Sequence, residues 1–247
     1  MPWPAEVERG LVLTDNAMGV MTRELSPPAR RFVELAAGAQ RPLLEIGAAY
    51  GNATLPALAA GATVVANDLS ASELAVLAEM APVPDRRRLV VLPARFPENV
   101  NLGDGSVSAV LAAQVLHFFD GETVDQAFAS VFRWLEPGGY FLVLVMTPSL
   151  SYYRKFRPAF EERLRAGERW PGLFDPKLAA TPDWRDRLPD RVNLFEKSIL
   201  ERCALEAGFV VEALDYFCFD EFPDEHRTDG REYVSLIARK PGQVVVV

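Results

Sequence analysis

Residues 43–52 read LLEIGAAYGN, and this stretch decides the fold. An apolar run passes into a turn of small residues and then into a stretch that can form a helix. Small residues let the backbone approach a ligand closely, and a helix N-terminus favours negative groups. We therefore expect a strand followed by a ligand-binding turn, although a tight turn without a ligand would give the same local pattern. The glycine spacing differs from that of the dinucleotide-binding fingerprint.

Outward from this stretch, short β-branched runs alternate with helical stretches, as in a parallel sheet that is covered by helices. The runs are almost continuously apolar, which is typical of strands buried on both faces. The sequence predicts an α/β, doubly wound, Rossmann-like fold with a seven-stranded mixed sheet, in which six strands are parallel and the last is antiparallel. The expected strands are 43–46, 63–67, 89–92, 108–112, 140–145, 209–217 and 232–239.

Capping residues mark the helices between these strands. Ser26 is followed by two prolines, and Ser70 stands three residues before Glu73, so both are expected N-caps. Pro137, Gly138 and Gly139 stop a later helix. The expected helices are 26–37, 70–80, 121–135 and 193–208.

Two regions do not follow the alternation. Residues 1–25 precede the first capped helix, and residues 148–192 form a connection far longer than is usual. The second region holds seven aromatic residues, which argues against a disordered linker: Tyr152, Tyr153, Phe156, Phe160, Trp170, Phe174 and Trp184. We expect a single domain over residues 1–247, with an N-terminal lid at 1–25 and a helical cap insertion at 148–192.

Composition and charge bear on the partners, the metal content and the location of the protein. The formal net charge of -8 argues against a nucleic-acid partner, because phosphate neutralisation needs a basic surface. Cys203 and Cys218 belong to no Cys/His cluster, so we expect no metal site and two reduced thiols. No secretory leader and no membrane-spanning run is evident, and the expected location is the cytoplasm.

Two segments together resemble the class I S-adenosylmethionine-dependent methyltransferase family, of the small-molecule or natural-product type. The first is the turn with Glu45, Gly47 and Gly51, in which Ala49 stands where the family often has a glycine. The second is VVANDLS at 64–70, whose acidic residue follows Glu45 by 23 positions. The resemblance implies S-adenosyl-L-methionine as cofactor and S-adenosyl-L-homocysteine as product. It implies that Glu45 orients the turn and the amino-acid end of the cofactor.

The resemblance extends over about residues 26–145 and the terminal hairpin. It implies that Asp68 binds both ribose hydroxyls, for which a carboxylate has enough acceptor sites. The residues that bind adenine are less well marked, because the acidic residue that many family members use for adenine is absent near Arg95. Phe96 or Leu69 are the expected neighbours of the adenine ring. The stretch 108–119, SAVLAAQVLHFF, is similar to the family's fourth strand and places Gln114 beside the methyl group.

His117 and the aromatic insertion are the candidates for chemistry on the acceptor. Imidazole titrates near neutrality, so His117 is a candidate general base, and equally a residue that only packs the loop. The expected acceptor pocket combines residues from the lid and from the cap: Met18, Met21, Tyr152, Tyr153, Phe156 and Trp170. The basic run 152–157 is expected either to recognise an anionic substrate or to form a solvated helix face.

The sequence therefore predicts methyl transfer to an oxygen or nitrogen atom of a small molecule or peptide-like natural product. An in-line displacement depends mainly on alignment of the reacting atoms, which binding can supply. Two alternatives remain open at this point. One is a methyltransferase that acts on a protein side chain or carboxylate, and the other is a cofactor-binding partner protein without transferase activity.

Overall fold

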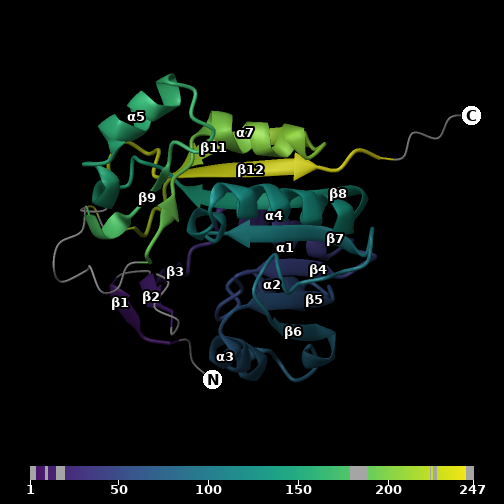
Figure 1. Cartoon of the computed structure of the whole chain (residues 1–247). Coiled ribbons are helices and arrows are strands. Elements are labelled where there is room, and N and C mark those ends of the chain that lie inside the picture. The colour runs from purple at the N-terminus through teal and green to yellow at the C-terminus, as the bar shows by residue number, and fades with distance from the viewer. Residues whose placement is uncertain are drawn as a thin grey trace, which may run out of the picture.

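The computed structural model describes residues 4–8, 11–14, 20–178, 189–222, 224 and 227–242. Its centre is a seven-stranded sheet in the order β11-β12-β8-β7-β4-β5-β6 (Figure 1). Strand β12 is antiparallel to both of its neighbours, and the other neighbouring pairs are parallel. The predicted mixed sheet is thus confirmed. The strands are β4 Leu43–Ile46, β5 Val64–Asp68, β6 Leu89–Pro93, β7 Val107–Ala113, β8 Leu135–Met146, β11 Val210–Phe217 and β12 Tyr233–Arg239.

Helices cover both faces of this sheet, because successive side chains point to opposite faces and the inner strands are apolar on both. On one face, Phe32 and Leu58 cluster with Leu43 of β4. On the other face, Phe128 and Leu200 cluster with Leu44 and neighbouring strands, among other buried side chains. Burial of each such side chain contributes roughly 1.5–3 kcal/mol. The α-helices are α1 Pro27–Ala36, α2 Thr54–Ala59, α3 Ala71–Met80, α4 Gly121–Trp134, α5 Arg157–Arg165 and α7 Lys197–Glu206.

Both predicted caps, at α1 and α3, are present. The Ser26 hydroxyl accepts a hydrogen bond from Ala29 N, and the Ser70 hydroxyl accepts one from Glu73 N. Glu196 is the N-cap of α7 and accepts from Lys197 N. Strand β8 begins five residues before the predicted start at Tyr140. The expected Pro-Gly-Gly stop lies inside this strand, where Gly138 adopts a φ of 85° beside a register shift.

The N-terminal region is built from strands. β1 Glu6–Glu8, β2 Leu11–Leu13 and β3 Val20–Thr22 form a three-stranded antiparallel sheet next to the main one (Figure 1). The insertion is mixed instead of purely helical, since β9 Leu173–Phe174 pairs with β10 Val192–Asn193 beside α5. Short 3-10 turns complete the chain: η1 Arg86–Arg88, η2 Leu116–Phe118, η3 Ser151–Tyr153 and η4 Pro176–Leu178.

A single apolar cluster ties the insertion, the N-terminal strands and the β11–β12 connection to the sheet. We call it the cap cluster, and its buried members are Leu11, Leu144, Leu150, Tyr153, Val192, Leu194, Phe219, Phe222 and Tyr233. Segments that are far apart in the sequence thus meet over the carboxyl end of β8. Within the described ranges, no helix is long and apolar enough to cross a membrane.

Candidate functional site

The turn after β4, residues 47–53, follows a backbone path that needs small residues. We call it the glycine turn. Gly47 and Gly51 have φ values of 68° and 84°. A Cβ atom on Gly47 would lie 2.3 Å from Val115 Cγ2, and one on Gly51 would lie 2.1 Å from Leu77 Cδ1. Ala49 also has a positive φ, of 44°, which costs an L-residue roughly 1–2 kcal/mol. Packing and backbone geometry therefore both explain the sequence of this turn.

Glu45 lies beneath the glycine turn and is almost completely buried. Its Oε2 accepts a hydrogen bond from Thr54 Oγ1 at the start of α2. Burial raises the pKa of Glu45 to about 7, and the nearby carboxylate of Asp68 acts in the same direction. A cation bound above this carboxyl would favour its ionised form.

Asp68 braces the glycine turn from the end of β5. Ala49 N donates to Asp68 Oδ2 at 2.9 Å, and Ser70 N donates to Asp68 Oδ1 at 2.9 Å. Each carboxylate oxygen retains acceptor capacity, so these bonds leave room for hydroxyl donors. The sequence pointed to Asp68 as a ligand, whereas its bracing role is visible only in the structure.

The residues expected around adenine differ in their surroundings. Leu69 is 49% exposed directly after Asp68, so its side chain presents an apolar surface to solvent at the carboxyl end of β5. Arg95 is exposed beyond β6. Phe96 is a core residue, with its ring 6.0 Å from those of Phe119 and Trp134. Packing accounts for Phe96 without a cofactor, and its contact with adenine stays a prediction.

Gln114 follows β7 and holds two segments together. Its backbone adopts a φ of 60°, and its N–H donates to Leu144 O at 2.7 Å. Its side-chain Nε2 lies 3.4 Å from Thr22 Oγ1 in β3. A positive φ in a residue with a side chain is strained, and such strain often occurs at functional sites. The sequence predicted Gln114 as a cofactor-binding residue, but it did not predict the contact of Gln114 with the N-terminal strands.

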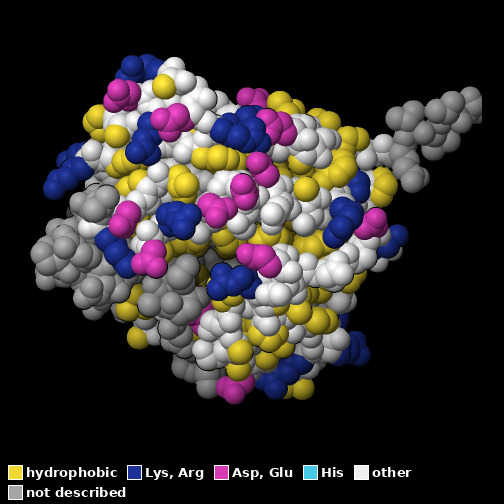
Figure 2. Space-filling view, in the orientation of Figure 1, with side chains coloured by type: hydrophobic (Ala, Val, Ile, Leu, Met, Phe, Trp, Pro, Cys, Tyr) yellow, Lys and Arg dark blue, Asp and Glu magenta, His cyan; other side chains and the backbone are white. Residues whose placement is uncertain are grey.

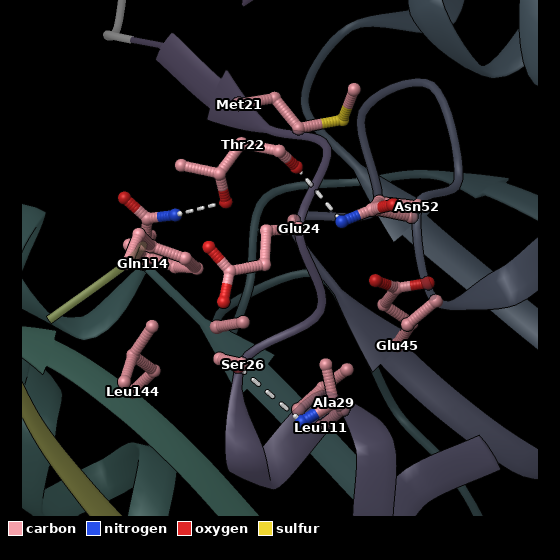
Figure 3. Close-up of a pocket in the computed structure, with 15 residues that line it drawn as sticks. Met21, Thr22, Glu24, Ser26, Ala29, Glu45, Asn52, Leu111, Gln114 and Leu144 are labelled. Atoms are coloured by element: carbon pink, nitrogen blue, oxygen red, sulfur yellow. Dashed lines mark hydrogen bonds between the residues drawn. The ribbon is translucent and has the colours of Figure 1, made fainter. Parts of the chain in front are cut away.

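A cavity opens between these elements, and Figure 3 shows Glu24, Glu45 and Gln114 around it. Asn52 Nδ2 donates to Thr22 O at 2.8 Å, which fixes β3 against the glycine turn. Together with Met21, the residues lining it are Thr22, Glu24, Ser26, Ala29, Glu45, Gly47, Ala48, Asn52, Ala53, Leu111, Ala113, Gln114, Leu144 and Phe219. No Lys, Arg or His side chain is among these lining residues. The cavity therefore favours a positively charged ligand.

Glu24 is a cavity residue that sequence reasoning missed. Its Oε2 accepts hydrogen bonds from Asp220 N at 2.8 Å and Glu221 N at 3.2 Å, in the turn after β11. Glu24 thereby connects the N-terminal segment to a region almost two hundred residues later. Its position two residues before the Ser26 cap was the only available signal.

His117 is 1% exposed and does not line the cavity. Its ring lies 4.3 Å from that of Phe118, and its Nδ1 has no hydrogen-bond partner among the described residues. Burial lowers the pKa of His117 to about 3, so the imidazole is neutral and weakly basic. This environment favours the packing alternative, and the general-base role stays a prediction.

The predicted acceptor residues that the structure describes lie in different surroundings, and their role stays a prediction. Met21 lines the cavity, Tyr153 belongs to the cap cluster, and Tyr152 is exposed. Phe156 stacks on Phe174 with ring centroids 3.9 Å apart.

Trp170 lies elsewhere, against the helical layer. Its indole is next to Gly121 at the start of α4, and Arg202 of α7 lies over the ring. Met18 and Trp184 lie outside the described residues, as do Asp15, Asn16 and His226. In the described ranges, no group of three His, Cys, Asp or Glu side chains has a metal-binding arrangement.

Comparisons with known proteins agree with this geometry. The family model for a methyltransferase domain matches residues 44–143. A S-adenosylmethionine-dependent methyltransferase structure from Methanosarcina mazei is 15% identical, with a TM-score of 0.66 over 89% of this chain and 100% of that chain. A comparison with curated proteins found no match.

Two further solved structures carry more specific descriptions. The glycopeptide N-methyltransferase MtfA is 20% identical, with a TM-score of 0.58 over 88% of this chain and 97% of its own. It has also been solved with S-adenosylmethionine and with S-adenosylhomocysteine. The 1,6-didemethyltoxoflavin-N1-methyltransferase of Burkholderia thailandensis is 18% identical, with a TM-score of 0.56 over 87% of this chain and 79% of its own. These likenesses concern the fold.

Proposed function

We propose that this chain, a class I S-adenosylmethionine-dependent methyltransferase, methylates an oxygen or nitrogen atom of a small molecule or peptide-like natural product. S-adenosyl-L-methionine is the cofactor and S-adenosyl-L-homocysteine the product. The observation that carries the proposal is the cavity beside the glycine turn, which is bounded by Met21 and Thr22 of β3 and by Phe219. A concave site of this kind suits a small acceptor better than a folded protein surface.

The residues around the cavity fit the cofactor. Gly47 provides close backbone approach, and the carboxyl groups of Glu24 and Glu45 suit a sulfonium and an ammonium group. Asp68 retains acceptor capacity for the ribose hydroxyls, and Leu69 offers an exposed apolar surface for adenine. Arg95 remains a candidate at the same edge.

When bound, S-adenosylmethionine supplies an electrophilic methyl group. The protein's own contribution is to hold the reacting groups in line and to exclude water, which can supply much of the rate enhancement. Leu111, Leu144 and Phe219 give the cavity an apolar wall for that purpose. Gln114, whose amide contacts Thr22, lines the cavity, and we assign it the role of orienting a polar group of the ligand (Figure 3).

We also propose that residues 1–25 and 148–192 act as lid and cap over this edge. Supporting contacts join β3 to the glycine turn and the insertion to the cap cluster. Mobile covers of this kind commonly gate access and release in enzymes. A cytoplasmic location fits the free thiols of Cys203 and Cys218. A role in natural-product biosynthesis would follow from the proposed class of acceptor.

A protein-modifying enzyme and a non-catalytic binding protein are the alternatives. On the face in Figure 2, cationic and anionic side chains are interspersed, without the broad basic field that would favour nucleic acid. The concave shape of the cavity supports a small acceptor over a protein. Turnover distinguishes an enzyme from a binding protein that keeps Glu45 and Asp68.

Calorimetry on the purified chain tests the proposal. We expect heat on titration with S-adenosylmethionine and S-adenosylhomocysteine, and none with a nicotinamide dinucleotide. Release of S-adenosylhomocysteine in the presence of small amine and hydroxyl acceptors then tests transfer. Binding of the nicotinamide dinucleotide instead of either sulfur ligand would overturn the proposal.

A further inference from the structure

A second hollow lies at the same end of the sheet, where β8 leads into the insertion. Its lining comes from the chain after β8, from the start of the insertion and from the segment before β12: Pro148, Ser149, Arg154, Arg157, Arg227, Thr228 and Asp229. None of these residues lines the first cavity. The two sites also differ in charge, because the first contains two glutamates and the second contains three arginines and one aspartate.

A buried carboxylate holds the loop that lines this basic hollow. Glu232 is fully buried, and its Oε1 accepts from Thr228 N at 2.5 Å and from Gly230 N at 3.4 Å. The Thr228 hydroxyl lies 2.5 Å from Ser149 O and so joins this loop to the chain after β8. Arg231 O accepts a hydrogen bond from the Thr147 hydroxyl. The segment that carries Arg227 is thus fixed on the sheet edge.

The three arginines of the basic hollow differ in how far they are neutralised. Arg157 is paired with Glu161 at 3.1 Å and with Asp229 at 3.4 Å. Asp229 itself is shared, since Arg231 Nη2 lies 2.6 Å from its Oδ2. Among the described residues, Arg154 and Arg227 form no ion pair with a carboxylate. Among the described residues that line the hollow, cationic side chains therefore outnumber anionic ones.

A neutral donor completes the arrangement. Ser149 is 8% exposed, and its hydroxyl makes no hydrogen bond to the described part of the chain. The guanidinium groups of Arg154 and Arg227 each offer a planar set of donors that matches a carboxylate or phosphate. The Ser149 hydroxyl and the exposed guanidinium groups of Arg154 and Arg227 line the same hollow, so all three can donate hydrogen bonds to one oxyanion.

We propose that the basic hollow binds an oxyanion, such as the carboxylate or phosphate group of a ligand. In a chain with a formal charge of -8, this hollow provides a local attraction for an acidic molecule. Assignment of that molecule as the methyl acceptor rests on the proposed function, because an acceptor must reach this end of the sheet. The binding of an oxyanion itself does not depend on methyl transfer.

Thermal unfolding in inorganic phosphate tests this proposal. Sodium chloride of equal ionic strength controls for screening, and the test variant is R154Q/R227Q. The matched control is R30Q/R87Q, which removes two exposed arginines from α1 and η1 with the same change in charge. At phosphate concentrations about ten times the dissociation constant, the parent and the control should gain roughly 3–6 °C in Tm over chloride. R154Q/R227Q should lose this gain.

The proposal is overturned if phosphate and chloride act alike on the parent, or if R154Q/R227Q keeps the full phosphate gain. Calorimetry with S-adenosylhomocysteine keeps the two proposals apart. Unchanged S-adenosylhomocysteine binding in R154Q/R227Q shows that the variant is folded. A parent that responds to phosphate but binds no S-adenosylhomocysteine would contradict the proposed function and leave the oxyanion site supported.

Discussion

The two sides of the ligand-binding edge are held by contacts of very different range. At the glycine turn, Asp68 bonds to Ala49 across 19 residues, and Thr54 bonds to Glu45 across nine. On the other side, where the N-terminal segment meets the turn after β11, Glu24 accepts a hydrogen bond from Asp220 across 196 residues. Closing a longer loop costs more entropy, although the cost grows slowly with length. We infer that the glycine turn is preformed. The lid and cap segments, residues 1–25 and 148–192, which we together call the cover, should open more readily.

The glycine turn and the N-terminal strands also differ in how they are packed. The glycine turn lies on strands whose residues are buried on both faces, as in β4. Of the described N-terminal residues, Leu11 alone is a buried member of the cap cluster, and β3 is held by polar contacts such as Asn52 to Thr22. Segments with few buried apolar contacts open at lower free energy than core strands. The four predictions below test this contrast.

The largest effect is expected from Gly47→Ala, with Gly61→Ala as its control. Both glycines have positive φ, but an added Cβ at Gly61 meets nothing within 4 Å, whereas at Gly47 it meets Val115 at 2.3 Å. Backbone strain should cost each variant roughly 1–2 kcal/mol, and overpacking should cost Gly47→Ala a further 1–3 kcal/mol. Urea unfolding measures both. Equal losses would show that the glycine turn yields easily and is not preformed.

The second prediction separates the two roles of Asp68. Asp68→Ala should weaken S-adenosylhomocysteine binding by about 1–3 kcal/mol, and Asp68→Asn by less, because one acceptor oxygen survives. Since Asp68 also braces Ala49, part of the loss reflects a loosened turn. A 2′-deoxy ligand distinguishes the parts: its penalty should be large in the parent and small in Asp68→Ala. If the 2′-deoxy penalty is equal in both proteins, Asp68 does not bind the ribose.

The third prediction concerns the pH dependence of stability through Glu45. Burial raises the folded-state pKa of Glu45 to about 7, above its usual 4.5, so the native protein binds the extra proton. The native state should therefore lose stability relative to the unfolded state as the pH rises from about 4.5 to 7, by an amount on the order of 1–3 kcal/mol. Glu45→Gln should remove this slope while keeping a polar partner for Thr54. Denaturant unfolding between pH 5 and 8 measures it, and parallel curves for the two proteins would contradict the prediction.

The sequence predicted the strands and helices around the glycine turn better than the contacts between segments that are far apart in the chain. Capping residues and apolar runs placed β4 and α3 at the residues where they occur, because their signals are contiguous. The β9–β10 pair and the β1–β3 sheet were missed, since two- and three-residue strands leave almost no pattern. The Glu24 contact was missed because nothing in the sequence relates positions 24 and 220. The burial of His117 likewise follows from tertiary packing.

The fourth prediction has the smallest effect and tests the cover directly. Glu24→Ala removes the acceptor of two backbone N–H groups, at Asp220 and Glu221, and should cost about 1 kcal/mol. Amide hydrogen exchange should become roughly five-fold faster at residues 20–24 and 219–222 and stay unchanged in β4 and β5. Glu24→Gln, which keeps one acceptor oxygen, should lie between the parent and Glu24→Ala.

Ligand binding should act on the same segments in the opposite direction. If the cover closes over the cofactor, S-adenosylhomocysteine slows exchange in residues 1–25 and 148–192 of the parent more than in the central strands. In Glu24→Ala this slowing should be weaker, because one of the contacts that close the cover is absent. Slowing confined to the glycine turn and β5, or equal in the parent and Glu24→Ala, would show that the two sides of the edge move as one unit.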